Sequence, residues 1–160
     1  MKYKVITTFK PDNWDRYAKR MVQSVLDKWT DADITVYYQG TKPSDFKNDV
    51  TWIDIDKANP GVRRSPRLAT EGGLDAKKES YLWNAVKFSY KVSCVTHAVN
   101  TYTDYDYVIW LDDDTYTFRN IPMQFIENIC PADTLVTYLD RENNRGSNKY
   151  PECGLVCYNI

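Results

Sequence analysis

The chain has 160 residues, of which 42% are hydrophobic and 14% aromatic, and its 21 basic and 22 acidic side chains leave a formal net charge of -1. This length predicts one domain with a hydrophobic core, and the lack of a strongly basic half argues against nucleic-acid binding. The start of the chain has no signal-peptide pattern, and the longest apolar run, 107–111, is far shorter than the ~20 residues that span a membrane. We therefore expect a cytoplasmic protein without a membrane span.

The cysteine pattern indicates free thiols. Cys94, Cys130, Cys153 and Cys157 form no CxxC pair, and a single histidine leaves no Cys/His zinc pattern. The last two are separated by a segment that has the pattern of a strand, which would hold their Cα atoms about 13 Å apart, too far for a disulfide. We expect all four to be reduced, as in a reducing compartment.

The first third of the chain alternates between strand and helix patterns. Residues 3–9, 34–38 and 50–55 are apolar runs of strand length. Between the first two, apolar residues recur at three- and four-residue spacing from Asn13, and Asp12 or Asn13 is the expected N-cap. The predicted apolar face of this helix consists of Trp14, Tyr17, Ala18, Met21, Val22, Val25 and Trp29.

A loop and a long helix come next. Residues 56–77 are rich in glycine, proline and arginine, a pattern that fits either a solvated excursion or a mobile loop near an anionic ligand. The helix is expected over 78–100, where its spacing puts Lys87 and Lys91 together at one edge of the apolar stripe and His97 nearly opposite, on the surface. That stripe is Tyr81, Ala85, Phe88, Val92, Val95 and Val99.

The remaining pattern completes an α/β fold. Residues 107–111 are apolar without alternation, which is typical of a strand buried on both faces of a parallel sheet. A short helix at 122–129, a strand at 135–139, a polar segment at 140–150 and a last strand at 155–158 follow. We predict an α/β/α sandwich with a mostly parallel central sheet, in one domain over residues 1–160.

Three adjacent carboxylates, Asp112, Asp113 and Asp114, follow the buried strand at once. Ligands of open parallel sheets bind beyond the carboxyl ends of the strands, and carboxylates that repel one another need cationic neighbours to stay ionised. Mg²⁺ or Mn²⁺ commonly shares carboxylate ligands with substrate phosphates. Asp112 and Asp114 can converge on one ion across a tight turn while Asp113 points elsewhere. The alternative is a solvated acidic turn.

Other chemistries that use similar carboxylate spacing fit this segment less well. The haloacid-dehalogenase phosphatases need threonine two places after the second aspartate, where this chain has Tyr116. An EF-hand loop that starts at Asp112 needs glycine and glutamate where Thr117 and Met123 stand. The chain also lacks a phosphate-binding loop and a GxGxxG pattern.

The segment 107–115, Tyr-Val-Ile-Trp-Leu-Asp-Asp-Asp-Thr, resembles the DxD segment of GT-A glycosyltransferases. Together with 83–91 (Trp-Asn-Ala-Val-Lys-Phe-Ser-Tyr-Lys) and 150–155 (Tyr-Pro-Glu-Cys-Gly-Leu), in that order, it is similar to bacterial and phage members of this class. The similarity covers most of the chain after Lys78 and, more loosely, its first strand and helix.

The resemblance implies transfer of a sugar, hexosyl or similar, from a nucleotide-diphosphate donor to an acceptor hydroxyl. Asp112 and Asp114 would hold Mn²⁺ or Mg²⁺ against the diphosphate, where the metal acts as a Lewis acid. Asp114 and Glu152 are the catalytic candidates, the latter as acceptor contact or general base. The expected nucleotide-binding residues are Thr7, Thr8, Phe9, Asp54 or Asp56, Lys87, Lys91, Asp112 and Asp113. For the two lysines, an ordinary solvated position is an equal alternative.

One departure concerns the metal. GT-A enzymes usually supply a further ligand, often histidine or aspartate, from beyond the last strand seen here, whereas this sequence stops at Ile160. Either Glu152 or Asp140 substitutes, or the domain lacks its C-terminal part, in which case we expect weak metal binding and slow transfer. The remaining alternatives are a non-catalytic nucleotide- or sugar-binding domain of the same fold and a metal-dependent phosphotransferase.

Overall fold

The structure, a computed structural model, describes residues 1–46, 49–60, 85–139 and 152–160. Its centre is one six-stranded sheet in the order β3-β2-β1-β4-β6-β5. In chain order the strands are β1 (Tyr3–Thr8), β2 (Asp33–Tyr38), β3 (Thr51–Asp54), β4 (Tyr107–Leu111), β5 (Val136–Leu139) and β6 (Glu152–Asn159). Each predicted strand is present, with ends that differ by at most three residues, and β4 has the predicted bounds.

The sheet is parallel on one side and antiparallel on the other. β1 pairs in parallel with β2 and β4, and β2 pairs in parallel with β3. β6 lies antiparallel between β4 and β5. The predicted mostly parallel sheet is therefore confirmed, and the carboxyl ends of β1 to β4 lie at one edge.

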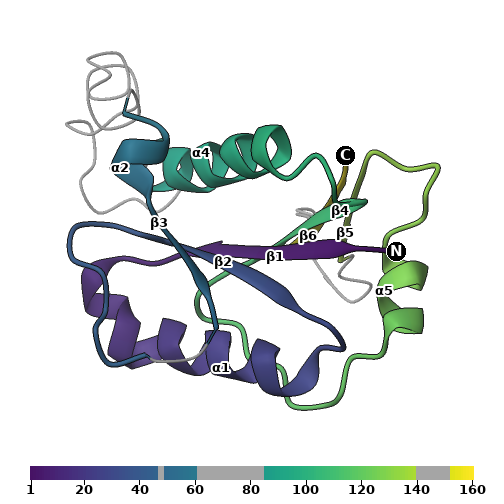
Figure 1. The fold of residues 1–160 in the computed structure, drawn as a ribbon, viewed down its shortest axis with the longest axis horizontal. Helices are drawn as coiled ribbons and strands as arrows, with labels where there is room; N and C mark the ends of the chain where they lie inside the picture. The colour runs from purple at the N-terminus through teal and green to yellow at the C-terminus, as the bar shows by residue number, and fades with distance from the viewer. Residues whose placement is uncertain (47–48, 61–84, 140–151) are drawn as a thin grey trace, which may run out of the picture.

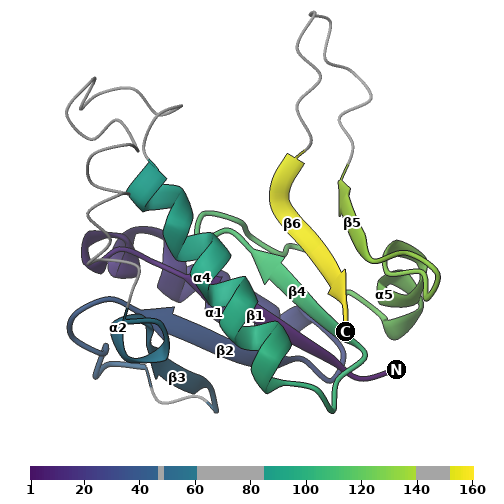
Figure 2. The ribbon, with the colours of Figure 1, turned by 90° about the horizontal axis from the view of Figure 1, so that it is seen from above.

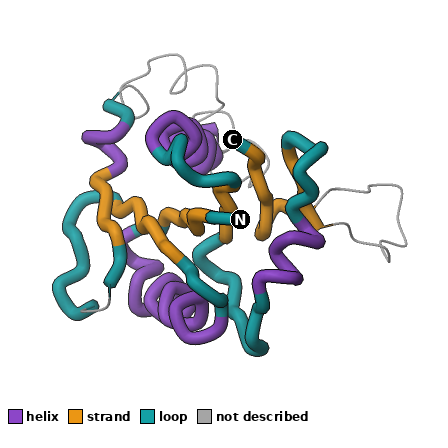
Figure 3. The backbone as a smooth tube through the Cα atoms, turned by 45° about the vertical axis from the view of Figure 1, so that its right-hand side comes forward, coloured by secondary structure: helices purple, strands orange, loops and turns teal. Residues whose placement is uncertain are grey.

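Helices cover both faces of the sheet, so the predicted α/β/α sandwich is confirmed (Figure 1). The chain enters the first helical segment through a 3-10 turn and a π-helical turn, Pro11–Asn13 and Trp14–Ala18. The α-helices are α1 (Lys19–Lys28), α2 (Ile55–Ala58), α4 (Ala85–Thr101) and α5 (Met123–Ile129). α1 lies on one face and α4 on the other, and the three layers are also separate in Figure 3.

The α1 face of the sheet has the core that the periodicity predicted. All residues of the predicted stripe are buried except Tyr17, which is half-buried. They pack against inward side chains of β1 and β4 such as Val5 and Ile109. The predicted N-cap is wrong, because Asp12 lies inside the 3-10 turn, and Asn13 stands at the N-cap position of the next turn without capping it through its side chain. The Asn13 amide instead donates to Asp113, 100 residues later.

The α4 face is packed differently from the prediction. Cys94 and Ala98 are fully buried against Ile6 and Val108, whereas Val92 of the predicted stripe is 64% exposed. Apolar residues occur on several sides of this helix, so periodicity did not define its buried side. Small side chains at positions 94 and 98 let the helix lie close to the sheet, on which it rests in Figure 2.

His97 is not the surface residue that the predicted stripe implied. Its Nδ1 lies 2.9 Å from the hydroxyl of Tyr37, and the two rings meet edge to face at 5.6 Å. Tyr37 is fully buried in the α4-face core. Burial lowers the pKa of His97 because the neutral ring is favoured away from water.

This position makes stability depend on pH. Because the folded pKa of His97 lies below the unfolded value near 6.5, its contribution is present above pH 6.5 and is lost as pH falls through the folded pKa. We expect the free energy of unfolding to fall between pH 7 and pH 5, by at most about 1.4 kcal/mol per pH unit. Urea unfolding across this range measures it. His97→Gln keeps an acceptor for Tyr37 and should flatten the profile, since His97 is the only histidine; an unchanged slope would contradict the assignment.

Two further expectations concern the chain as a whole. All four cysteines are free thiols, as predicted, although Cys153 alone is exposed. Among the described residues, no helix has both the length and the apolar character needed to cross a bilayer.

Candidate active site

A pocket of about 510 Å³ opens at the edge where the parallel strands end. Its walls come from the segments after β1, β2 and β4, from the first half of α4, and from the start of β6. The lining residues are Thr8, Phe9, Lys10, Asn13, Tyr17, Gln39, Phe88, Tyr90, Lys91, Trp110, Asp112, Asp113, Asp114 and Cys153. The three predicted carboxylates therefore share one pocket with the first-strand residues and a lysine of α4.

The carboxylates lie on the tight turn that the sequence predicted. The backbone N–H of Thr115 donates to the carbonyl of Asp112 at 3.1 Å, and the Thr115 hydroxyl donates to the same oxygen at 2.8 Å. The N–H of Asp112 is bound to the carbonyl of Gly154 in β6 at 3.0 Å. These bonds fix the turn directly against the end of the buried strand.

Asp112 is held by two donors on one oxygen. Trp110 Nε1 donates to Asp112 Oδ1 at 2.6 Å, and Lys91 Nζ lies 3.3 Å from the same oxygen. The Lys91 ammonium also donates to the carbonyl oxygen of Cys153 at 2.5 Å. This lysine is therefore part of the carboxylate site rather than an ordinary solvated residue.

The other two carboxylates have different surroundings. Asp113 Oδ2 accepts a hydrogen bond from Asn13 Nδ2 at 2.9 Å, which turns this side chain toward the first helical segment. Burial raises the pKa of the Asp113 carboxyl, the bond from Asn13 opposes that rise, and the charges of Asp114 and Asp112 add to it. Asp114 is exposed and has no hydrogen bond or ion pair to any residue in the described part of the chain.

The three predicted residues at the end of β1 have separate environments. Thr7 is fully buried, its hydroxyl has no hydrogen-bond partner among the described residues, and it does not line the pocket. Thr8 lines the pocket, and its hydroxyl donates to the carbonyl of Tyr37 at 2.9 Å. Phe9 also lines the pocket and packs on Trp14, with 5.0 Å between ring centroids. Thr8 is thus the member of this segment that a ligand can reach, whereas Phe9 borders the pocket and is only 2% exposed.

The remaining candidates either lie away from the pocket or have side chains outside the described residues. The Asp54 side chain caps α2 by accepting from the N–H of Asp56 at 3.0 Å, and neither aspartate lines the pocket. Glu152 is the first residue of β6, opposite Leu139. The side chains of Glu152 and Lys87, all of Asp140, and the basic loop at 61–77 lie outside the described residues.

The sequence analysis missed eight lining residues: Lys10, Asn13, Tyr17, Gln39, Phe88, Tyr90, Trp110 and Cys153. Trp110 had a usable signal, because it stands two places before Asp112 and so points to the same side of the strand. Asn13 was assigned to helix capping, and nothing in the local pattern links it to Asp113. The roles of Tyr17 and Gln39 depend on tertiary packing.

The donor set suits a hard divalent cation that is shared with phosphate. Asp112 and Asp114 offer carboxylate oxygens, which Mg²⁺ and Mn²⁺ prefer. Within the described ranges, however, no group of three or more acidic, cysteine or histidine side chains is arranged to hold a metal ion. The residues therefore fit an ion that completes its shell with ligand oxygens and water, not an all-protein cage.

Comparison with solved structures decides the fold. The chain superposes on the bifunctional glycosyltransferase WbbM, in its apo form, with a TM-score of 0.60 at 12% identity, over 99% of this chain and 31% of that one. It superposes on mouse xyloside xylosyltransferase 1, also apo, with a TM-score of 0.58 at 15% identity, over 99% of this chain and 67% of that one. The chain has a GT-A fold. No family model and no curated protein sequence matches it.

At 12% and 15% identity, these two likenesses show the fold of this chain and nothing more. The chain spans about a third of WbbM and two thirds of the xylosyltransferase. The predicted fold class is confirmed, and the roles of individual residues remain predictions that depend on the pocket itself.

Proposed function

We propose that this GT-A domain transfers a sugar from a nucleotide-diphosphate donor to an acceptor hydroxyl, with a divalent cation held by Asp112 and Asp114. One observation carries the proposal: these carboxylates end the buried strand β4, inside a pocket that also contains the Lys91 ammonium 3.3 Å from Asp112. Carboxylates for a metal and an ammonium for a phosphate are what a donor of this kind requires.

The pocket can bind both halves of such a donor. Tyr17 offers aromatic surface, and Gln39 offers an amide, so this part of the lining suits a nucleobase and ribose. Lys91 can pair with the diphosphate, and Lys87, one turn earlier on α4, is the predicted second cation. Asp113, tied to Asn13, is predicted to contact the nucleotide and not the metal.

Catalysis would depend on stabilising the departing diphosphate. A divalent cation at Asp112 and Asp114 supplies Lewis-acid stabilisation of that charge when bound. Lys91 adds a positive charge in a partly buried setting, where charge–charge interactions are stronger than in water. Glu152 remains the proposed acceptor contact or general base.

The direct test is binding of nucleotide-diphosphate sugars, measured by thermal unfolding with and without Mn²⁺. A ligand at 100 times its Kd stabilises the folded state by about 2.7 kcal/mol, and a 1 kcal/mol gain raises Tm by roughly 2–4 °C in a chain of this size. We expect a shift of several degrees for one donor type, only when Mn²⁺ is present.

Turnover is tested separately, by release of labelled sugar from the donor that gives the largest shift. Binding without transfer or hydrolysis would support the non-catalytic alternative. A phosphoenzyme formed at Asp112 would support phosphotransfer instead. No shift with any donor would contradict the proposed function.

A further inference from the structure

Lys91 lies at a place that is already suited to a cation. Its Nζ is 3.3 Å from Asp112 Oδ1, 2.5 Å from the carbonyl oxygen of Cys153, and 4.8 Å from the centre of the Trp110 ring. A carboxylate, a carbonyl oxygen and the face of an indole are three groups that attract positive charge. These groups belong to β4, to the turn after it and to β6, and α4 places the Lys91 ammonium among them.

The same contacts limit how Asp112 can bind a metal. Oδ1 is already shared by the Lys91 ammonium and the Trp110 indole N–H, which lies 2.6 Å away. A divalent cation bound through this carboxylate would lie within a few ångströms of the ammonium. The two positive charges would repel each other strongly at that separation, because the Lys91 side chain is only 22% exposed and water screens its charge little.

We propose that Lys91 and the divalent cation compete for Asp112, and that a diphosphate ligand ends the competition by drawing the ammonium onto its own oxygens. This inference rests on the proposed function, since it takes Asp112 and Asp114 as the metal ligands. Lys91 is then a positioning residue with opposite effects in two states: it weakens metal binding to the free protein and strengthens binding of metal together with diphosphate. Metal and diphosphate therefore bind cooperatively, and part of their coupling passes through this one side chain.

The test measures Mn²⁺ binding by the EPR signal of the free ion, with Mn²⁺ alone and with Mn²⁺ plus inorganic pyrophosphate. Lys91→Met removes the charge and keeps the length of the side chain. With Mn²⁺ alone we expect the variant to bind about tenfold more tightly than wild type, and with pyrophosphate present about tenfold more weakly. Lys91→Gln serves as a second variant, and circular dichroism checks that each is folded.

The control is Lys57→Met on α2, which removes an exposed positive charge that does not line the pocket. It should change the Kd of Mn²⁺ alone less than about twofold. Equal tightening by Lys57→Met would overturn the inference, because a general loss of positive charge would then explain the result.

The failure of this inference differs from failure of the metal site itself. If Lys91→Met leaves the Kd of Mn²⁺ alone unchanged while Asp112→Asn abolishes binding, the metal site stands and the competition is disproved. If wild type and both Lys91 variants bind no Mn²⁺, the metal assignment and the inference are both overturned. If Lys91→Met tightens Mn²⁺ binding without pyrophosphate and weakens it with pyrophosphate, a purely structural role of Lys91 cannot explain the result.

Discussion

Replacing Asp112 and Asp114 together by alanine should abolish Mn²⁺-dependent nucleotide binding and leave the fold intact. Both side chains line the pocket from one turn, and the bonds that hold this turn are made by backbone groups and Thr115. Charge-assisted contacts contribute about 1.5–3 kcal/mol each, so the loss of both should weaken Mn²⁺ binding by roughly 100-fold or more.

We expect the stability of this variant without metal to change little, because relief of charge repulsion is opposed by the loss of the Asp112 contacts to Lys91 and Trp110. The charges of Asp114 and Asp112 help to raise the pKa of Asp113, which shows that the three carboxylates repel one another. Removing two of them relieves that repulsion. Thermal unfolding without metal separates this effect from the loss of ligand binding.

The matched control is Asp27→Ala with Glu127→Ala, two exposed carboxylates on α1 and α5. It changes the net charge by the same amount at residues that do not line the pocket, so its Mn²⁺ affinity should equal that of wild type within about twofold. Unchanged Mn²⁺ affinity in the Asp112/Asp114 variant would remove the metal assignment.

The sequence predicted the structure correctly where a pattern of residues is compatible with only one arrangement. The unalternated apolar run of β4 requires apolar cover on both faces, and the structure places this strand between β1 and β6 with every residue buried. Because the carboxylates follow it directly, their place at the sheet edge was predictable too. The first helix has apolar residues on one side only, so its buried face was also predictable.

The sequence did not predict the structure where a pattern of residues is compatible with several arrangements. α4 carries apolar residues around much of its circumference, so the choice between Val92 and Cys94 as the buried side depended on how closely the helix approaches the sheet. That error displaced His97 to the wrong side. Lys91 was predicted near the diphosphate, but its contacts with Asp112 and the Cys153 carbonyl were not. They depend on how α4 lies on the sheet and on β6 lying next to β4.

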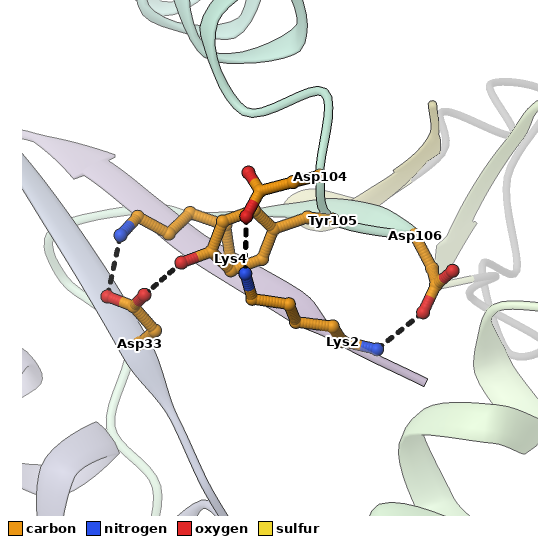
Figure 4. A network of polar contacts seen from close by, with 6 residues as sticks. All are labelled: Lys2, Lys4, Asp33, Asp104, Tyr105 and Asp106. Carbon is orange, nitrogen blue, oxygen red and sulfur yellow. Dashed lines mark hydrogen bonds and ion pairs between the residues drawn. The ribbon is translucent and has the colours of Figure 1, made fainter.

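A second large effect is expected at the opposite edge of the sheet, where Lys4 is buried. Its side chain is only 4% exposed, and its Nζ lies 2.6 Å from Asp33 Oδ1 (Figure 4). The ammonium also lies 4.6 Å from the centre of the Tyr102 ring, and Asp33 accepts a second hydrogen bond from the Tyr105 hydroxyl. Asp33 is therefore the main counter-charge of a lysine that water barely reaches.

Asp33→Ala should destabilise the fold more than removal of the lysine does. It leaves a buried ammonium without its carboxylate, a change that costs about 3–5 kcal/mol in fully buried pairs. Because the Asp33 side chain is 46% exposed, water can partly replace it, and we expect about 2–3 kcal/mol. Lys4→Met removes the charge itself and keeps an apolar stem, so it should cost about 1 kcal/mol or less.

The pH dependence of the pair gives an independent check. Burial favours a higher pKa for Asp33, but the hydrogen bonds from Lys4 and Tyr105 and the charges of Lys4 and Lys2 outweigh it and lower the pKa below 3.8. A lowered folded pKa contributes stability that is present above 3.8 and is lost as pH falls through the folded pKa. Urea unfolding at pH 7 and pH 3 should therefore show that the free energy of unfolding falls less with acid in Lys4→Met than in wild type.

In the double variant with Lys4→Met and Asp33→Ala, the losses of unfolding free energy should not add, because Lys4→Met removes the unpaired charge that Asp33→Ala creates. Additive costs would mean that Lys4 and Asp33 act independently and that the aromatic rings alone accommodate the buried ammonium.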